Sequence, residues 1–154
     1  MIREAKPGEG SLIAEEFWYP LATEMAEHSV LNELTEDALA VAREGFEELL
    51  AEDQRYDFLL EDEGTAVGYI SAETGTRPTR KRGKYASIID LYVKEGHRGQ
   101  GHGTALVEHV EQLAAREDCD FLRVSAEWDN AGARDFYEKH GYGTKQVKYA
   151  KVVE

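Results

Sequence analysis

The sequence predicts a single α/β (α+β) domain covering residues 1–154, with elements in the order β-α-α-β-β-β-α-β-α-β. Two apolar stretches at helical spacing fill the first third, and β-rich runs around a tight hairpin signal follow them. A glycine-rich loop then separates a strand from an amphipathic helix. With 154 residues and 42% hydrophobic composition the chain is long enough to bury one core, and no repeat or linker divides it.

The first third predicts a short strand and two helices. Residues 2–6 form the strand, and a helix over residues 11–28 is indicated by apolar side chains four positions apart: Ile13, Phe17, Leu21 and Met25. Pro20 should kink that helix because it lacks an N–H group. Thr35 is expected to cap a second helix, whose apolar positions are Leu39, Ala42, Phe46, Leu49 and Leu50.

The middle third predicts a hairpin and one more strand. Residues 55–73 read as two strands joined at Glu63-Gly64, where glycine permits the positive φ that a tight turn requires. An exposed basic loop over residues 77–84 leads to a strand with the sequence YASIIDLYV. The helix after the glycines has its apolar side chains at Leu106, Val110, Leu113 and Ala114.

The last third predicts a strand, a short helix and a closing strand. The run FLRVSAEW has strand chemistry, and Asp129 or Asn130 can cap a helix that continues to His140. Gly141 is suited to end that helix in the left-handed conformation. The segment KQVKYAKVV is expected to be the final strand.

Composition excludes several classes of function. A net charge of −13, from 31 acidic and 18 basic residues, disfavours binding to nucleic acid. The acidity fits a solvated, salt-adapted surface or attraction of cationic amines, and composition does not separate the two. Without an apolar run of spanning length or a signal-peptide pattern, we expect a cytoplasmic protein with no membrane partner. The single Cys119 allows no internal disulfide, and no metal-ligand spacing is present.

The glycine-rich loop indicates an anion site. A helix N-terminus presents unpaired N–H groups and a partial positive charge, and glycines let an anion approach them closely. Thr104 stands where a G-x-G-x-x-G fingerprint needs its last glycine, and no Walker-type lysine follows. The loop instead fits R/Q-x-x-G-x-G/A, as Arg98-Gly99-Gln100-Gly101-His102-Gly103. An ordinary tight turn is the alternative interpretation.

This loop resembles the pyrophosphate-binding motif of the GNAT superfamily of N-acetyltransferases. A second stretch, NAGARDFYEKHGY, is similar to the family's N-x-x-A-x-x-F/Y-Y-x-x-x-G-F/Y signature. The resemblance implies a mixed, mostly antiparallel sheet flanked by helices, with acetyl-CoA as acetyl donor. It also implies that acetyl-CoA is held by backbone groups of Leu91, Tyr92, Val93, Arg98, Gly99, Gln100, Gly101, His102, Gly103 and Thr104.

The same resemblance gives roles to two residues of the second motif. Asn130 matches the family's side-chain contact to the pantetheine arm, although a helix N-cap explains it equally well. Tyr137 matches the tyrosine that faces the thioester sulfur and can protonate the departing thiolate. A buried core tyrosine is the alternative for Tyr137.

The general base is less clear from the sequence. The reaction needs a neutral amine, and Asp90 and Glu127 both lie near strand ends that should border the acceptor side. Either carboxylate also fits a solvated surface position, as do the ring nitrogens of His97 and His102. A backbone N–H near Tyr92 is expected to stabilise the oxyanion. Ile89 replaces a glutamate that is common in polyamine-acetylating relatives, which weakens a polyamine assignment.

The sequence therefore predicts direct acetyl transfer from acetyl-CoA to a primary amine, on a small molecule or on a peptide or protein. Cys119 lies outside both motifs, which argues against a covalent enzyme intermediate. A non-catalytic acyl-CoA-binding regulatory domain is the alternative. Whether the chain forms a homodimer stays open.

Overall fold

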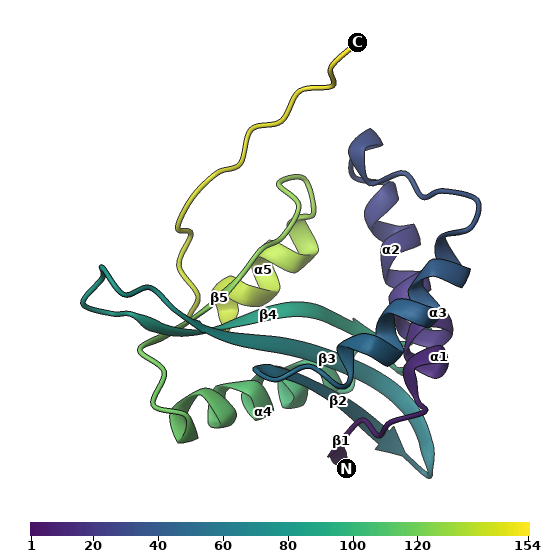
Figure 1. The fold of residues 1–154 in the computed structure, drawn as a ribbon, viewed down its shortest axis with the longest axis horizontal. Coiled ribbons are helices and arrows are strands. Elements are labelled where there is room, and N and C mark those ends of the chain that lie inside the picture. The colour runs from purple at the N-terminus through teal and green to yellow at the C-terminus, as the bar shows by residue number, and fades with distance from the viewer.

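The computed structural model describes residues 1–154 and has the predicted α+β architecture, with helices packed on a single five-stranded sheet (Figure 1). Its strands follow the order β1-β2-β3-β4-β5, and neighbours are antiparallel except β4 and β5, which are parallel. The strands are β1 (Ile2–Glu4), β2 (Arg55–Asp62), β3 (Thr65–Thr76), β4 (Lys84–Val93) and β5 (Phe121–Val124). None of the helices combines the length and apolar character needed to cross a bilayer.

The first predicted helix is present, with a break in its hydrogen-bonding pattern before Pro20. It comprises α1 (Gly10–Ile13), a π-helical turn η1 (Ala14–Trp18) and α2 (Tyr19–Ala26). Pro20 stands in the first turn of α2, where its missing N–H is tolerated. The wider turn of η1 therefore accommodates the proline that the sequence predicted would kink this helix.

The second helix begins later than expected. A short 3-10 turn, η2 (Val30–Asn32), precedes α3 (Ala38–Leu49), whose N-cap residue is Asp37 without a side-chain capping bond. The predicted cap at Thr35 is wrong, because the Thr35 carbonyl accepts from the Ala38 N–H at 3.3 Å within a turn that precedes the helix.

The hairpin between β2 and β3 turns at the predicted pair. Glu63 has φ 51° and Gly64 has φ 80°, so both central residues adopt the left-handed conformation of a type I′ turn. The turn brings Asp62 opposite Thr65 and sets the start of the register between β2 and β3.

Two hydrophobic cores lie on opposite faces of the sheet. Helix α4 (His102–Arg116) buries Leu106, Val107 and Val110 against β2, β3 and β4. The other face packs against η1 and α3, with Phe17, Phe46 and Tyr69 among the buried residues. Because strand side chains alternate between faces, β2, β3 and β4 each contribute to both cores.

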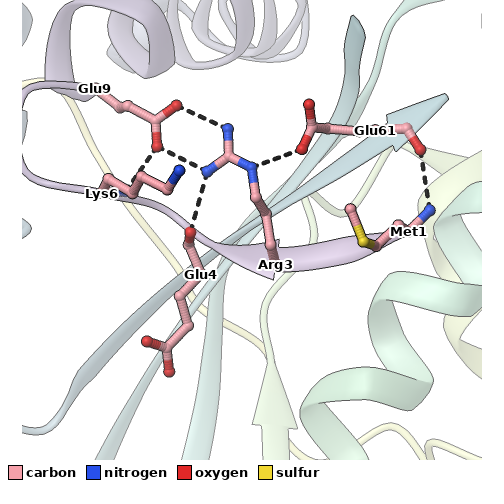
Figure 2. Close-up of polar contacts among 6 residues, drawn as sticks. All are labelled: Met1, Arg3, Glu4, Lys6, Glu9 and Glu61. Carbon is pink, nitrogen blue, oxygen red and sulfur yellow. Dashed lines mark hydrogen bonds and ion pairs between the residues drawn. The ribbon is translucent and has the colours of Figure 1, made fainter. Parts of the chain in front are cut away.

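An ionic cluster anchors β1 and α1 to the sheet (Figure 2). The Arg3 guanidinium donates to both Glu9 carboxylate oxygens at 2.8 Å and to Glu61 Oε1 at 2.6 Å. Glu61 lies on β2, and its carbonyl accepts from the Met1 ammonium at 3.0 Å. The first nine residues are thereby tied to a central strand and to the start of α1.

The C-terminal helix is as predicted, but the final strand is wrong. Helix α5 (Ala131–Lys139) follows Asn130, and Gly141 ends it with φ 87°. Residues 143–154 are exposed and form no strand, and Figure 1 shows this segment leading away from the sheet. The alternating pattern of KQVKYAKVV has no partner strand, and β-propensity alone does not form a strand. The run FLRVSAEW is strand only to Val124.

Candidate functional site

The site lies where β4 and β5 separate. These strands pair only from Tyr85 opposite Phe121 to Ile88 opposite Val124, whereas β4 continues to Val93. A cavity of about 500 Å³ occupies the gap, between the continuation of β4 and residues 125–127. The parallel pair is therefore opened at its carboxyl end, and that end receives the loop before α4.

The loop presents a row of free backbone donors. It runs from η3 (Glu95–His97) to the N-cap of α4 at Gly101, and Gly99 and Gly101 have φ of 77° and 85°. No backbone N–H from Arg98 to Thr104 donates to a carbonyl of the chain. A Cβ at Gly99 or Gly101 would meet nothing within 4 Å, so the loop is open to solvent on that side. The loop thus has the geometry of an anion cradle.

His102 adds an unsatisfied polar atom to this cavity. Its Nε2 is buried and has no hydrogen-bond partner within the chain, and its ring lines the cavity. His102 as a whole is half-buried in the first turn of α4, so its Nε2 is not a solvated surface nitrogen. A buried nitrogen without a partner fits a site that receives a polar ligand.

Arg98 is held away from the free amides. Its Nε donates to the Val93 carbonyl at 2.8 Å and its Nη2 to Glu24 Oε1 at 2.9 Å, while the guanidinium lies 5.1 Å from the Tyr92 ring centroid. The Arg98 side chain thus fixes the loop to β4 and α2. The donors available to an anion at this loop are therefore the backbone N–H groups.

The exposed edge of β4 offers backbone groups at alternate residues. The N–H groups of Asp90 and Lys94 both point toward β3, to Ser71 Oγ and the Val67 carbonyl. Alternation then directs the N–H groups of Leu91 and Val93 toward the gap left by β5. The Tyr92 N–H faces β3, so Leu91 supplies the open donor that was expected near Tyr92.

A β-bulge at Ile89 directs Asp90 toward the α3 side of the sheet. Ser71 pairs with Asp90 and Ala72 with Ile88, which leaves Ile89 without a partner. Ile88 belongs to the core under α4, and without the extra residue Asp90 would point into that same core. The bulge instead brings Asp90 near Arg55. Burial raises the pKa of the Asp90 carboxyl, while the charge of Arg55 partly opposes this shift.

Beside Asp90 lies a buried ion pair that sequence reasoning missed. Arg55 donates to both Asp57 carboxylate oxygens, at 3.0 and 3.1 Å, and the Tyr69 hydroxyl donates to Asp57 Oδ1 at 2.5 Å. The side chains of Arg55 and Asp57 are each only 4% exposed. The sequence signal for this ion pair was an Arg-x-Asp alternation at the start of β2. That spacing places both side chains on one face of the strand.

Tyr137 reaches the cavity from α5. Its ring packs against Phe136 and Tyr142, with centroids 5.2 and 5.8 Å away. Burial, followed by the charge of Asp90, raises the pKa of the Tyr137 phenol to about 12. The phenol therefore stays protonated at neutral pH and lies in the electrostatic field of Asp90.

Glu127 and Asn130 both line the cavity, but each already has a protein partner. Glu127 Oε1 accepts from the Asn32 amide at 2.8 Å, a contact between η2 and the chain after β5. Asn130 Oδ1 accepts from the Ala133 N–H at 3.1 Å, which is the N-cap bond expected for α5. Glu127 thus joins η2 to the chain after β5, and Asn130 is a cap that also borders the cavity.

Nearly all the expected site residues meet in this one cavity. Gln100 is the exception, because it does not line the cavity. The lining residues named in advance are Asp90, Leu91, Tyr92, Val93, Arg98, Gly99, Gly101, His102, Gly103, Thr104, Glu127, Asn130 and Tyr137.

Comparison with known sequences identifies relatives over most of the chain. The model of the acetyltransferase (GNAT) family matches residues 17–142. A thialysine N-epsilon-acetyltransferase from Bos taurus is 31% identical, over 92% of this chain and 82% of its own. An uncharacterized N-acetyltransferase from Methanocaldococcus jannaschii is 27% identical over 69% of this chain, and the match spans 47% of that relative's length.

Solved structures agree with the fold. A mutant of a Bacillus halodurans protein superimposes with a TM-score of 0.87 at 19% identity, covering 99% of both chains. A predicted acetyltransferase from Clostridium acetobutylicum, solved with acetyl-CoA, gives a TM-score of 0.77 at 18% identity over 99% of this chain and 95% of its own. At these identities the likeness shows a shared fold.

Proposed function

The chain belongs to the acetyltransferase (GNAT) family, and from that premise we propose that it transfers an acetyl group directly from acetyl-CoA to a primary amine. The observation that carries the proposal is one cavity in which free backbone N–H groups at a helix N-terminus lie together with Asp90 and Tyr137. The N–H groups can hold a pyrophosphate. Asp90 and Tyr137 can each transfer a proton.

The described residues fit acetyl-CoA. The N–H groups from Arg98 to Thr104 match the negative charge of a pyrophosphate, and the unsatisfied His102 Nε2 is a further polar contact for it. Leu91 and Val93 can pair with the amides of the pantetheine arm as an added strand would. When bound, acetyl-CoA supplies a thioester carbonyl for attack and a thiolate that leaves.

We assign Asp90 as the general base. An alkylammonium has a pKa of about 10.4, so the acceptor must lose a proton before its nitrogen can attack. Asp90 lines the cavity, and its raised pKa makes it a better proton acceptor than a fully solvated carboxylate. Glu127, the other candidate, is engaged by Asn32 and is assigned a positioning role.

We assign Tyr137 as the general acid and Leu91 N–H as the donor to the carbonyl oxygen. The new C–N bond forms as the C–S bond breaks, and the Tyr137 proton passes to sulfur. After attack the nitrogen loses its second proton, which restores the Tyr137 phenol. Asp90 releases to solvent the proton that it took from the ammonium. The net products are an acetamide, the free thiol and one proton.

A thiol-release assay tests this function against the alternative of a non-catalytic acyl-CoA-binding domain. Acetyl-CoA is offered with small amines, with amino acids and with peptides that have a free N-terminus or lysine. We expect turnover with at least one amine, and loss of turnover in the Asp90→Asn, Tyr137→Phe double variant with acetyl-CoA affinity retained. Tight binding without thiol release from any acceptor establishes the binding-domain alternative.

A further inference from the structure

A second cavity lies on the other side of β4. Its volume is about 510 Å³, and it is bounded by η1, by residues 33–35, by α3 and by β4. Ile89 and Asp90 line both this cavity and the one that holds the glycine loop. The two cavities therefore adjoin at the β-bulge, beside the carboxylate assigned as the base.

The walls of this second cavity are mostly apolar. Trp18, Leu34, Val41 and Phe46 line it, and Val41 is 60% exposed although it is a large apolar residue. An exposed apolar side chain at the mouth of a hollow is typical of a ligand site.

Few charges in this cavity are available to a ligand. Arg55 lines it, but its guanidinium is engaged by Asp57 and Glu73 and is 4% exposed, so it is not free to receive a carboxylate. The other charged lining residues are both acidic: Asp90 where the cavities adjoin, and the exposed Glu33. The cavity thus combines apolar walls with carboxylates alone.

We propose that this second cavity binds the body of the acceptor, and that the acceptor is a primary amine carried on an apolar or aromatic group without a carboxylate. The ammonium end meets Asp90 where the cavities adjoin, and the carbon skeleton lies against Trp18, Val41 and Phe46. This inference rests on the proposed acetyl transfer. A polyamine would bring a second ammonium against apolar walls, where a charge is costly to desolvate.

Gly45 allows a test that separates binding from folding. It lies in α3 and lines the cavity, and a Cβ there would meet nothing within 4 Å. Gly45→Leu should fill the cavity without weakening the helix, because leucine has a higher helix propensity than glycine. Ala40→Leu, on an exposed position of α3 outside the cavity, is the matched control.

The experiment measures KM for phenylethylamine, 1,4-diaminobutane and lysine, KM for acetyl-CoA, and thermal unfolding. We expect phenylethylamine to have the highest kcat/KM and Gly45→Leu to raise its KM about tenfold or more, as when a cavity loses space for its ligand. KM for acetyl-CoA and the melting temperature should not fall, and Ala40→Leu should match the wild type.

Two results overturn the inference while leaving acetyl transfer intact. One is a higher kcat/KM for diaminobutane or lysine than for phenylethylamine. The other is an unchanged phenylethylamine KM in Gly45→Leu. Failure of the proposed function has a different signature, because acetyl-CoA would then bind without thiol release from any amine.

Discussion

Asp90 has opposing consequences for stability and for chemistry. Its carboxyl has a raised pKa in the folded protein because burial disfavours the charged form, even with Arg55 nearby. Between the unfolded value of about 3.9 and the raised folded value, the folded state binds the proton more tightly, so stability falls as pH rises through that interval. At neutral pH the ionised side chain is therefore a cost to the fold and the form that the reaction needs.

Asp90→Asn is expected to raise stability at neutral pH and to remove most turnover. The amide resembles the protonated carboxyl, so the melting temperature at pH 7 should rise while kcat falls by about 10² to 10⁴, the range of a general base. Thermal unfolding and thiol release on the same preparation check both. Glu127→Gln keeps an oxygen acceptor for Asn32 and is the control. Equal losses of turnover in the two variants would contradict the assignment of Asp90 alone.

The pH profile gives an independent check on this residue. Ionised Asp90 must take the proton of the acceptor ammonium, so activity should rise as pH rises through the raised pKa of Asp90. Activity should decline when Tyr137, with its pKa of about 12, loses its proton. Asp57, Glu73 and Arg55 also face Asp90 and influence where the rise begins. In Asp90→Asn the acidic limb set by the carboxyl should disappear, leaving only the titration of the acceptor.

Tyr137→Phe separates a catalytic phenol from a core aromatic residue. The ring contacts with Phe136 and Tyr142 are kept, so the melting temperature and acetyl-CoA affinity should barely change. Loss of the proton donor should lower kcat by about 10² to 10⁴. A drop in stability of about 1 kcal/mol with normal kcat would instead identify a structural hydroxyl.

The loop before α4 depends on backbone conformation, which suggests a pair of glycine variants. Gly101 and Gly64 both have positive φ, near 85° and 80°, and a Cβ at either meets nothing within 4 Å. Valine at either position therefore imposes similar strain, of about 1–2 kcal/mol. Only Gly101→Val should weaken acetyl-CoA binding, because only that side chain projects among the free amides. Calorimetric titration of acetyl-CoA into both folded variants checks this. Equal affinities would contradict the proposal that acetyl-CoA binds at the loop before α4.

Elements with strong local signals could be predicted from sequence. The hairpin at Glu63-Gly64, the Asn130 cap and the left-handed Gly141 each follow from the chemistry of one or two residues, and all three are present. Elements that depend on a distant partner could not. The segment after Tyr142 has a strand pattern without a strand to pair with, and β5 ends at Val124 because β4 diverges from it.

At the scale of the molecule, the glycine loop with its free backbone N–H groups was predictable and the second cavity was not. The glycines and the two motifs lie in short contiguous stretches, so local sequence identifies them. The second cavity is assembled from η1, residues 33–35, α3 and β4, which are far apart in the chain. The direction of Asp90 depends on a bulge at Ile89, and a bulge appears only when β3 and β4 are aligned.

The N-terminal ionic cluster joins the sheet to the helices that wall the second cavity. Arg3 links β1 to Glu9 and Glu61, and Glu47 of α3 accepts from the Gly10 N–H at 2.7 Å. Arg3 hydrogen-bonding holds the pKa of Glu9 down, to about 2, despite partial burial. This paired carboxylate therefore stabilises the fold above its unfolded pKa, and the contribution is lost as pH falls toward about 2.

Comparing Glu9→Gln with Glu15→Gln tests this coupling across the whole domain. Glu9 is 21% exposed and bidentate with Arg3, whereas the Glu15–Arg43 pair is 44% exposed at both side chains. Hydrogen bonds to charged groups contribute about 1.5–3 kcal/mol when shielded, and exposed pairs about 0–1 kcal/mol. Urea unfolding at neutral pH should therefore show a larger loss for Glu9→Gln. As pH falls from about 5 toward 2, wild type and Glu9→Gln should converge, because protonation removes the same charge that the substitution removes. A gap of constant size down to the lowest pH would mean that Glu9 stabilises the N-terminal segment through packing, not through its charge.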